Sequence, residues 1–207
     1  MIELRRVYLI RHGEVEERFH QVFGGRLDMG LSAQGQVQVQ RLARALAPLP
    51  LQVIFTSPLQ RARLTAEPLA QARNLPLIVL DELRELDFGD WTGCSWQEVE
   101  QRFGISAYDW LDALEAGKIP NAEPLDQFWA RLRAATERIQ QQNDTSQVAV
   151  VCHGGVIRGL LSLWLQVPLR KTAAFEVDYA SVTLVSWTTR GWRLRLLNFT
   201  PWNGLPT

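Results

Sequence analysis

Three polar segments, far apart in the chain, carry side chains that could bind and transfer a phosphoryl group. Arg11 and His12 come directly after a short apolar run, and Arg61 and His153 follow two further runs of the same kind. A neutral imidazole can act as a nucleophile, and an arginine guanidinium matches the oxygens of a phosphoryl group. These residue types predict phosphoryl transfer, provided that the fold brings the segments together.

The apolar runs have the form of buried strands that end in loops. The run at residues 7–10 contains a β-branched residue and an aromatic, and it stops at a turn that contains Gly13. The runs at residues 53–56 and 148–152 are similar and are also followed by polar or glycine residues. Ligands bind at the carboxyl ends of strands in sheets flanked by helices. We therefore expect the three segments at one edge of a sheet.

Arg61 and His153 each have an ordinary alternative role, as a surface arginine and as a satisfied polar residue. Arg61 is expected in the first turn of a helix, where backbone N–H groups and the helix dipole favour an anion. Gly154 and Gly155 after His153 allow the backbone to approach a ligand closely. Their joint placement at the ends of separate strands favours a common site.

Strand and helix patterns alternate along the chain, which predicts a three-layer α/β/α fold around a mostly parallel sheet. Ser32 is predicted to cap one helix, and Ser57 another with Pro58 as its first residue. The apolar face of this second helix is expected to begin at Leu59. Residues 181–199 predict an antiparallel hairpin at the sheet edge.

Residues 81–124 differ from the rest of this predicted single domain, 1–207. They are rich in acids, glycine and tryptophan and hold only short helical patterns, around residues 95–103 and 106–116. Two interpretations are open: a lid-like insertion over the sheet edge, or a pair of packing helices without ligand contact.

The composition limits the partners and the compartment. Lys plus Arg and Asp plus Glu both number 22, so a broad basic surface for nucleic acid is not expected. Two cysteines imply no disulfide framework and favour a reducing cytoplasm. No apolar run approaches the ~18 residues of a membrane span, and the first run is too short for a signal peptide.

The chain resembles the histidine phosphatase superfamily, also called phosphoglycerate mutase-like, through a series of motifs in the family's order. These motifs are residues 9–14, Asp28 with Leu31, Ser32 and Gly35, residues 56–62 with Thr65 and Ala66, residues 83–85 with residues 88–91 and Gly93, and residues 150–155. The resemblance implies a phosphoglycerate mutase-like fold and a phosphoric monoester hydrolase that needs no cofactor.

The resemblance also implies roles for individual residues. His12 would attack phosphorus and form a phosphohistidine. Arg11, Arg61 and His153 would hold the oxygens, whose charge must be neutralised during transfer. At cellular pH an imidazole with the reference pKa of about 6.5 is readily neutral, as a nucleophile must be.

A carboxylic acid completes the implied site. Glu82, Glu85 and Asp87 are close in sequence, and spacing alone does not choose among them; the family motif selects Glu85 as general acid and then general base. Gly24 and Gly154 are expected to bind substrate together with the arginines.

The sequence departs from the family's pattern on the side of the site that binds the leaving group. Val15, Arg18 and residues 121–124 depart from the family's pattern at positions that line the leaving-group side in relatives. The pattern is similar to the α-ribazole phosphatase branch of cobalamin assembly, which makes α-ribazole 5′-phosphate one candidate among small phosphorylated metabolites. A broad-specificity phosphatase and a cofactor-dependent phosphoglycerate mutase are the alternatives, although the short chain favours hydrolysis. A homodimer is left open.

Cys152 and Arg158 offer a competing motif, Cys-x5-Arg, in which a thiolate attacks phosphate. Val151 stands before the cysteine where histidine is usual, and Gly159 follows the arginine where serine or threonine is usual. Successive strand residues point to opposite faces, so a His153 in the pocket turns Cys152 toward the core.

Two further functions are weaker alternatives. A catalytically inactive phosphate-binding module would not need both His12 and Glu85. A metal site is not expected, because the three histidines (His12, His20 and His153) form no ligand motif. His20 is expected in a loop or at the pocket rim.

Overall fold

A six-stranded sheet forms the centre of the computed structural model, which describes residues 3–141 and 146–202. The strand order is β3-β2-β4-β1-β5-β6; β1, β2, β3 and β4 pair in parallel, and β5 and β6 are antiparallel. The strands are β1 (Glu3–Arg11), β2 (Val53–Thr56), β3 (Leu77–Val79), β4 (Gln147–Cys152), β5 (Val182–Thr188) and β6 (Gly191–Phe199). The predicted parallel sheet with an antiparallel hairpin at one edge is confirmed.

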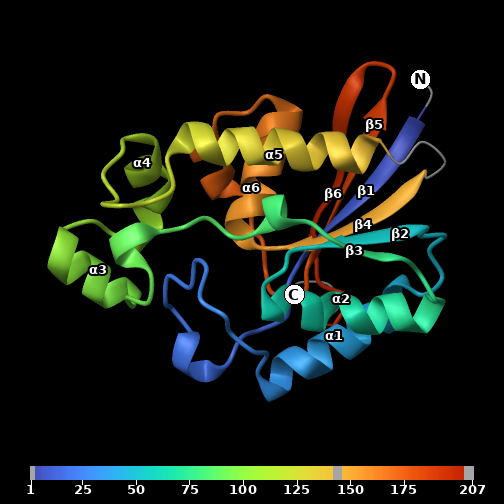
Figure 1. Ribbon diagram of the computed structural model, residues 1–207, viewed down its shortest axis with the longest axis horizontal. Helices are drawn as coiled ribbons and strands as arrows, with labels where there is room; N and C mark the ends of the chain where they lie inside the picture. The colour runs from blue at the N-terminus through green and yellow to red at the C-terminus, as the bar shows by residue number, and fades with distance from the viewer. Residues whose placement is uncertain (1–2, 142–145, 203–207) are drawn as a thin grey trace.

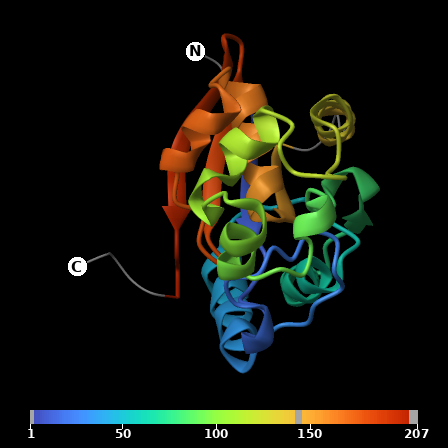
Figure 2. The same ribbon diagram turned by 90° about the vertical axis from the view of Figure 1, so that its left-hand side faces the viewer.

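Helices cover both faces of the sheet, as Figures 1 and 2 show. One layer holds α1 (Ala33–Leu46) and α2 (Gln60–Arg73), and the other holds α5 (Leu125–Gln140) and α6 (Gly154–Leu165). Alternate residues of β1 serve the two layers, because strand side chains point to opposite faces. Tyr8 and Ile10 pack in the cluster that includes α1 and α2, and Val7 and Leu9 in the cluster with α5 and α6. The three-layer α/β/α prediction is confirmed.

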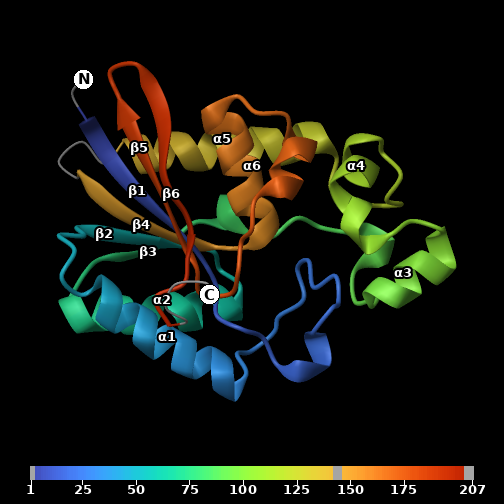
Figure 3. The ribbon, with the colours of Figure 1, turned by 180° about the vertical axis from the view of Figure 1, so that it is seen from behind.

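The remaining helices are short, and most lie beyond the carboxyl end of the sheet. In Figure 1, α3 (Trp96–Phe103) and α4 (Trp110–Glu115) stand apart from the strands, and Figure 3 shows the same arrangement from behind. The 3-10 helices are η1 (Glu17–Phe19), η2 (Asp81–Leu83), η3 (Gly89–Trp91), η4 (Ala107–Asp109) and η5 (Leu169–Ala174). None of the helices in the described ranges is long and apolar enough to cross a bilayer.

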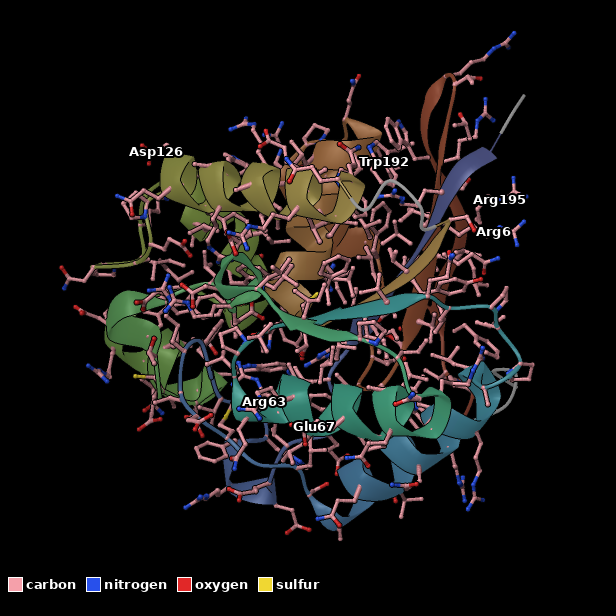
Figure 4. All side chains as sticks on the ribbon, turned by 45° about the vertical axis from the view of Figure 1, so that its right-hand side comes forward. Arg6, Arg63, Glu67, Asp126, Trp192 and Arg195 are labelled. Atoms are coloured by element: carbon pink, nitrogen blue, oxygen red, sulfur yellow. The ribbon has the colours of Figure 1, made fainter. Side chains whose placement is uncertain are left out.

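Two contacts near the surface involve α2 and the β5–β6 hairpin. The outward side of α2 carries an ion pair between Arg63 and Glu67, 3.1 Å apart (Figure 4). The β5–β6 hairpin docks on α6 through stacked indoles of Trp192 and Trp164, whose ring centroids are 4.2 Å apart. Aromatic side chains bury much apolar area, so this stack anchors the edge of the sheet.

The start of α2 differs from the prediction. Ser32 caps α1 as expected, accepting a hydrogen bond from Gly35 N at 2.9 Å. Ser57, however, does not cap α2: the N-cap is Leu59, without a side-chain bond, and Gln60 is the first helical residue. The prediction was wrong for Ser57, Pro58 and the half-buried Leu59. The Ser57 hydroxyl lies 2.8 Å from His153 Nε2, and this long-range contact replaces the local cap.

The register of the parallel strands aligns the loops that carry the predicted site. Arg11 of β1 pairs with Cys152 of β4, and Thr56 of β2 pairs with Val151. The ladder continues one residue further, since His12 N donates to Cys152 O at 3.0 Å. The residues that follow β1, β2 and β4 therefore meet at one end of the sheet.

Candidate active site

His12 follows the last residue of β1, and its ring is fixed by the loop that it begins. Nδ1 lies 2.8 Å from Gly13 O. A carbonyl oxygen only accepts, so Nδ1 carries the hydrogen and Nε2 keeps its lone pair. Arg61 Nε approaches this Nε2 at 3.3 Å, and Gly13 N donates to Thr65 Oγ1 at 2.9 Å. The neutral tautomer and its orientation are thus set by neighbours from β1 and α2.

Both site histidines are held in the neutral form. Burial, with Arg61 and Arg11 adding positive charge nearby, lowers the pKa of His12 well below its usual value. Burial and the charge of Arg61 lower the pKa of His153 in the same direction. His12 is 5% exposed and His153 is 0% exposed, so desolvation of the charged form is strong. At pH 7 neither ring carries a charge.

His153 is the N-cap residue of α6, at the end of β4. Its ring centroid lies 5.2 Å from that of His12. Nε2 lies 2.8 Å from the Ser57 hydroxyl oxygen. This oxygen accepts a hydrogen bond from Leu59 N at 3.3 Å and can donate its own hydrogen to Nε2, which leaves the ring hydrogen on Nδ1. Nδ1 is buried and has no hydrogen-bond partner within the described ranges. This nitrogen can therefore bind an additional polar group.

Arg61 lies in the first turn of α2, as predicted, and is almost fully buried. Its guanidinium donates to Leu27 O and Gly25 O, both at 2.7 Å. Burial lowers the pKa of Arg61 to about 10, so the group remains charged at neutral pH. The loop at residues 24–29 therefore fixes a buried cation beside His12.

Arg11 is the last residue of β1. Its Nη1 donates to Val177 O at 2.6 Å, and the guanidinium carbon lies 4.0 Å above the centroid of the Tyr179 ring. Its Nε is buried and unpartnered among the residues that the structure describes. Gly154 is adjacent, since a Cβ built there would lie 3.8 Å from this Nε. Arg11 thus brings a second positive charge, with an unpartnered Nε–H, to the cavity that His12 and Arg61 line.

Glu85 comes from the loop after η2 and is held by backbone groups. Its Oε1 accepts a hydrogen bond from Leu86 N at 2.9 Å, and its Oε2 accepts one from Gly155 N at 3.1 Å. A Cβ at position 155 would lie only 2.6 Å from Oε1, so any larger residue there would displace the Glu85 carboxylate. Backbone N–H groups of its own loop and of the start of α6 therefore fix the Glu85 carboxylate.

The structure shows which of the three neighbouring acids, Glu82, Glu85 and Asp87, reaches the cavity. Glu82 lies 3.3 Å from Arg138 Nε, and Asp87 lies 3.4 Å from Arg26 Nη1. Glu85 lines the cavity, and the described lining contains neither of the other two. The position of Glu85 in the fold thus agrees with the family motif, which selects Glu85 as the acid.

Arg131 of α5 holds the loop that carries Glu85. Nη1 donates to Glu82 O at 2.8 Å and to Arg84 O at 2.7 Å. Nε and Nη2 donate to the two carboxylate oxygens of Glu123 at 2.6 and 2.9 Å. Both side chains are largely buried, so removing either one would leave the other as an unpaired charge with little access to water.

A cavity of about 420 Å³ joins these groups. The predicted residues that line it are Arg11, His12, Gly24, Arg61, Glu85 and Gly154. His153 lies beneath the surface, in ring contact with His12. The structure therefore brings all seven predicted residues to one place. Buried cations, unpartnered donors and a neutral imidazole there can bind a tetrahedral anion.

The sequence matches a known family over nearly its whole length. The family described as "Histidine phosphatase superfamily (branch 1)" matches residues 7–200. The chain belongs to this family. It is a phosphatase, and its fold is that of the phosphoglycerate mutase-like proteins.

Relatives with different names are similarly close. The chain is 31% identical to phosphoserine phosphatase 1 of Hydrogenobacter thermophilus over 195 residues, 94% of this chain and 92% of the relative. It is 27% identical to the adenosylcobalamin/α-ribazole phosphatase of Escherichia coli, covering 93% and 95%. The crystal structure of the α-ribazole phosphatase from Shigella flexneri aligns with a TM-score of 0.82 at 26% identity, covering 93% and 96%.

Cys152 is not placed for the thiolate chemistry of the competing motif. It is fully buried in the core cluster that includes α5 and α6. Burial raises the pKa of the Cys152 thiol, and the nearby charge of Glu85 adds to this effect. Arg158 donates to Thr172 O. The prediction of a buried thiol is confirmed.

His20 lies where the sequence predicts it, in a loop at the surface. His20 Nε2 lies 3.0 Å from Val15 O, and the side chain is half-exposed in the loop after η1. Within the described ranges, no group of three or more His, Cys, Asp or Glu side chains could hold a metal ion.

Sequence reasoning missed Tyr179, whose ring lies under Arg11 and 5.6 Å from the ring of His12. It belongs to an irregular segment without a periodic pattern. A signal was available, because the predicted antiparallel hairpin must bring the residues before it to an edge of the parallel sheet. Ala180 N donates to His12 O at 3.0 Å at that point.

Proposed function

We propose that this phosphatase hydrolyses phosphomonoesters of a small metabolite in two steps, through a phosphohistidine on His12. The observation that carries the proposal is the fixed tautomer of His12. Its Nδ1–H is bound by Gly13 O, which leaves the Nε2 lone pair beside Arg61 in the cavity. A neutral, oriented imidazole next to buried cations is the arrangement that nucleophilic attack on phosphorus needs.

In the first step, His12 Nε2 attacks phosphorus and the ester P–O bond breaks. Protonated Glu85 donates its proton to the leaving alcohol oxygen. Arg11, Arg61 and His153 bind the three remaining oxygens. Arg11 and His153 do so through the unpartnered Nε and Nδ1 described above. Arg61, whose three nitrogens already donate to His12, Leu27 and Gly25, contributes mainly its positive charge. The phosphoryl group is then bonded to His12.

In the second step, a water molecule attacks the phosphohistidine and gives its proton to the Glu85 carboxylate. The P–N bond breaks, phosphate leaves, and His12 returns to its neutral state. Glu85 is again protonated, so the cycle is balanced. The two backbone N–H groups that hold its oxygens keep the carboxyl group in place for both transfers.

The chain would act as one domain in which residues 81–124 form a lid-like insertion. Glu85, Trp96 and Tyr108 of this segment line the cavity, which favours the lid over packing helices without ligand contact. Relatives named for α-ribazole and for phosphoserine make esters of both kinds candidate substrates. Two buried free cysteines suit a reducing compartment, and we place the enzyme in the cytoplasm.

A pair of variants tests the nucleophile. With p-nitrophenyl phosphate, His12→Ala is expected to abolish turnover, whereas Cys152→Ser keeps it, because the thiol is buried in the core. Activity that survives His12→Ala and disappears in Cys152→Ser would reassign the nucleophile. Phosphate binding without turnover in the unmodified protein would support a binding module instead. Activity is expected to be undiminished in EDTA.

A further inference from the structure

Beyond the phosphate-binding groups, the cavity has an aromatic wall. The rings that line it are Phe19, Phe23, Phe88, Trp96, Tyr108 and Trp110. Neighbouring rings touch: the centroids of Phe23 and Phe88 are 5.0 Å apart, and those of Phe88 and Trp110 are 5.4 Å apart. Tilted and edge-to-face contacts at such distances fix the rings. The wall is therefore a preformed apolar surface.

Two segments far apart in the sequence build this wall together. The loop after β1 and the segment before α3 pair through a bridge between Val22 and Ser95. Trp96 N donates to Gln21 O at 2.8 Å, which places the backbone of Trp96 beside that loop. Figure 1 shows the two segments next to each other beyond the carboxyl end of the sheet. The wall thus continues directly from the loop that contains His12.

Trp96 and Tyr108 stand out by their exposure. Trp96 is 36% exposed and Tyr108 is 77% exposed, and their ring centroids are 5.4 Å apart. Both line the cavity, so their exposed faces border the space where a substrate would lie. Covering such apolar area is favourable by about 25 cal/mol per Å². The pair therefore favours a ligand with an apolar surface.

The charges in the cavity disfavour an anionic leaving group. The charged residues of its lining are Arg11, Arg61, Glu85, Arg158, Glu176 and Asp178. A phosphate dianion engages the first two, and Glu85 is neutral when it acts as an acid. Among the other charged lining residues, Arg158 is one cation against the two carboxylates of Glu176 and Asp178, which leaves one negative charge. A leaving group with its own carboxylate would be repelled.

We propose that the aromatic half of the cavity is a leaving-group subsite, and that the preferred leaving group is an uncharged alcohol carrying a planar apolar ring. This inference rests on the proposed function. The cavity of about 420 Å³ has room for such a ring beside the phosphate, whereas a small cation such as choline would leave much of the aromatic wall uncovered.

Four phosphate esters of primary alcohols test the preference. These esters are 2-phenylethyl phosphate, glycerol 3-phosphate, 3-phosphoglycerate and phosphocholine. Because all four release a primary alcohol, differences in kcat/KM report mainly how the leaving group binds. We expect 2-phenylethyl phosphate to exceed glycerol 3-phosphate about tenfold or more, and 3-phosphoglycerate to be the poorest. A higher kcat/KM for 3-phosphoglycerate or phosphocholine than for 2-phenylethyl phosphate overturns the proposal.

Substitutions test whether the preference for an aromatic leaving group comes from the aromatic wall. Tyr108→Ala is expected to reduce the ratio of the kcat/KM values for 2-phenylethyl phosphate and glycerol 3-phosphate by roughly five- to tenfold. Because Tyr108 is so exposed, the variant should fold, which its melting temperature checks. Phe199→Ala removes an aromatic of 39% exposure on β6, away from the cavity, and should leave the ratio unchanged. Equal ratios in the native protein and Tyr108→Ala contradict the subsite.

Glu176→Gln tests the charge argument separately. It should raise kcat/KM for 3-phosphoglycerate several-fold relative to glycerol 3-phosphate, since one repelling charge is removed. No change in this ratio contradicts the electrostatic part of the proposal. The proposed function fails in a different way, namely by turnover of glycerol 3-phosphate that survives His12→Ala.

Discussion

The two ends of the cavity are built in different ways. At the phosphate end, His12, Arg61 and His153 are nearly or fully buried and are held by backbone carbonyls, a hydroxyl and one another. At the other end, Trp96 and Tyr108 are exposed side chains on short helical segments outside the sheet. The sheet and its adjoining loops thus hold the groups for phosphoryl transfer, whereas we propose that surface segments select the leaving group. Relatives with the same fold and different substrate names are consistent with this division.

The largest effect is expected from the acid that joins the two ends. Glu85→Gln should lower kcat for glycerol 3-phosphate by about 10²–10⁴, because the amide cannot transfer a proton. The loss should be smaller for p-nitrophenyl phosphate, whose leaving group needs little protonation. Glu82→Gln is the matched control: Glu82 lies three residues earlier, in η2, and pairs with Arg138 outside the cavity. An equal loss in both variants would contradict the assignment.

An intermediate effect is expected at Arg131, which holds the backbone of that loop. Arg131→Met should reduce the free energy of unfolding by about 3–5 kcal/mol, because it leaves the buried Glu123 carboxylate without its main partner. It should also lower kcat about tenfold, since the carbonyls of Glu82 and Arg84 lose their donor and Glu85 is held less firmly. Denaturant unfolding and steady-state kinetics measure the two effects.

A second substitution separates stability from positioning at Arg131. Adding Glu123→Leu to Arg131→Met removes the unpaired charge and should recover part of the stability. The lower kcat should persist, because the carbonyls still lack their donor. If kcat returns together with stability, the arginine has no positioning role.

The last predicted effect is the pH dependence of stability, which should come from the buried phosphate end. The pKa values of His12 and His153 are lowered by burial, so the folded protein stays neutral there while the unfolded chain takes up protons near pH 6.5. As the pH falls below about 6.5, the free energy of unfolding should decrease by up to about 1.4 kcal/mol per pH unit for each histidine.

Melting temperatures between pH 7.5 and pH 5 in phosphate-free buffer check this prediction. His12→Gln should flatten the curve, whereas His20→Gln, on a half-exposed loop side chain, should keep the native slope. A slope that is the same in all three proteins would show that the buried site does not cause the acid sensitivity.

The sheet and the phosphate end were predictable because local signals specify them. Apolar runs at the strands and the polar residues that follow them placed Arg11, His12, Arg61 and His153 at one sheet edge. The start of α2 was not predictable, since a contact between Ser57 and His153, distant in sequence, replaces the expected cap. Local cap preferences do not include such long-range competition.

The parts built by tertiary contacts could not be derived from spacing. Glu82, Glu85 and Asp87 are chemically similar neighbours, and the fold decides which of them reaches the cavity. Arg131 lies in a helix whose apolar stripe indicates packing, yet its side chain binds carbonyls of a loop far back in the sequence. Tyr179 lies in an irregular segment, where no periodicity marks a residue.

Trapping the covalent intermediate on His12 tests the central claim most directly. During turnover of a good substrate, quenching in alkali and mass spectrometry of peptides should find an acid-labile phosphoryl group on His12, and none in His12→Ala. A phosphoryl group on the peptide that contains Cys152, or turnover without any covalent adduct on His12, would contradict the account.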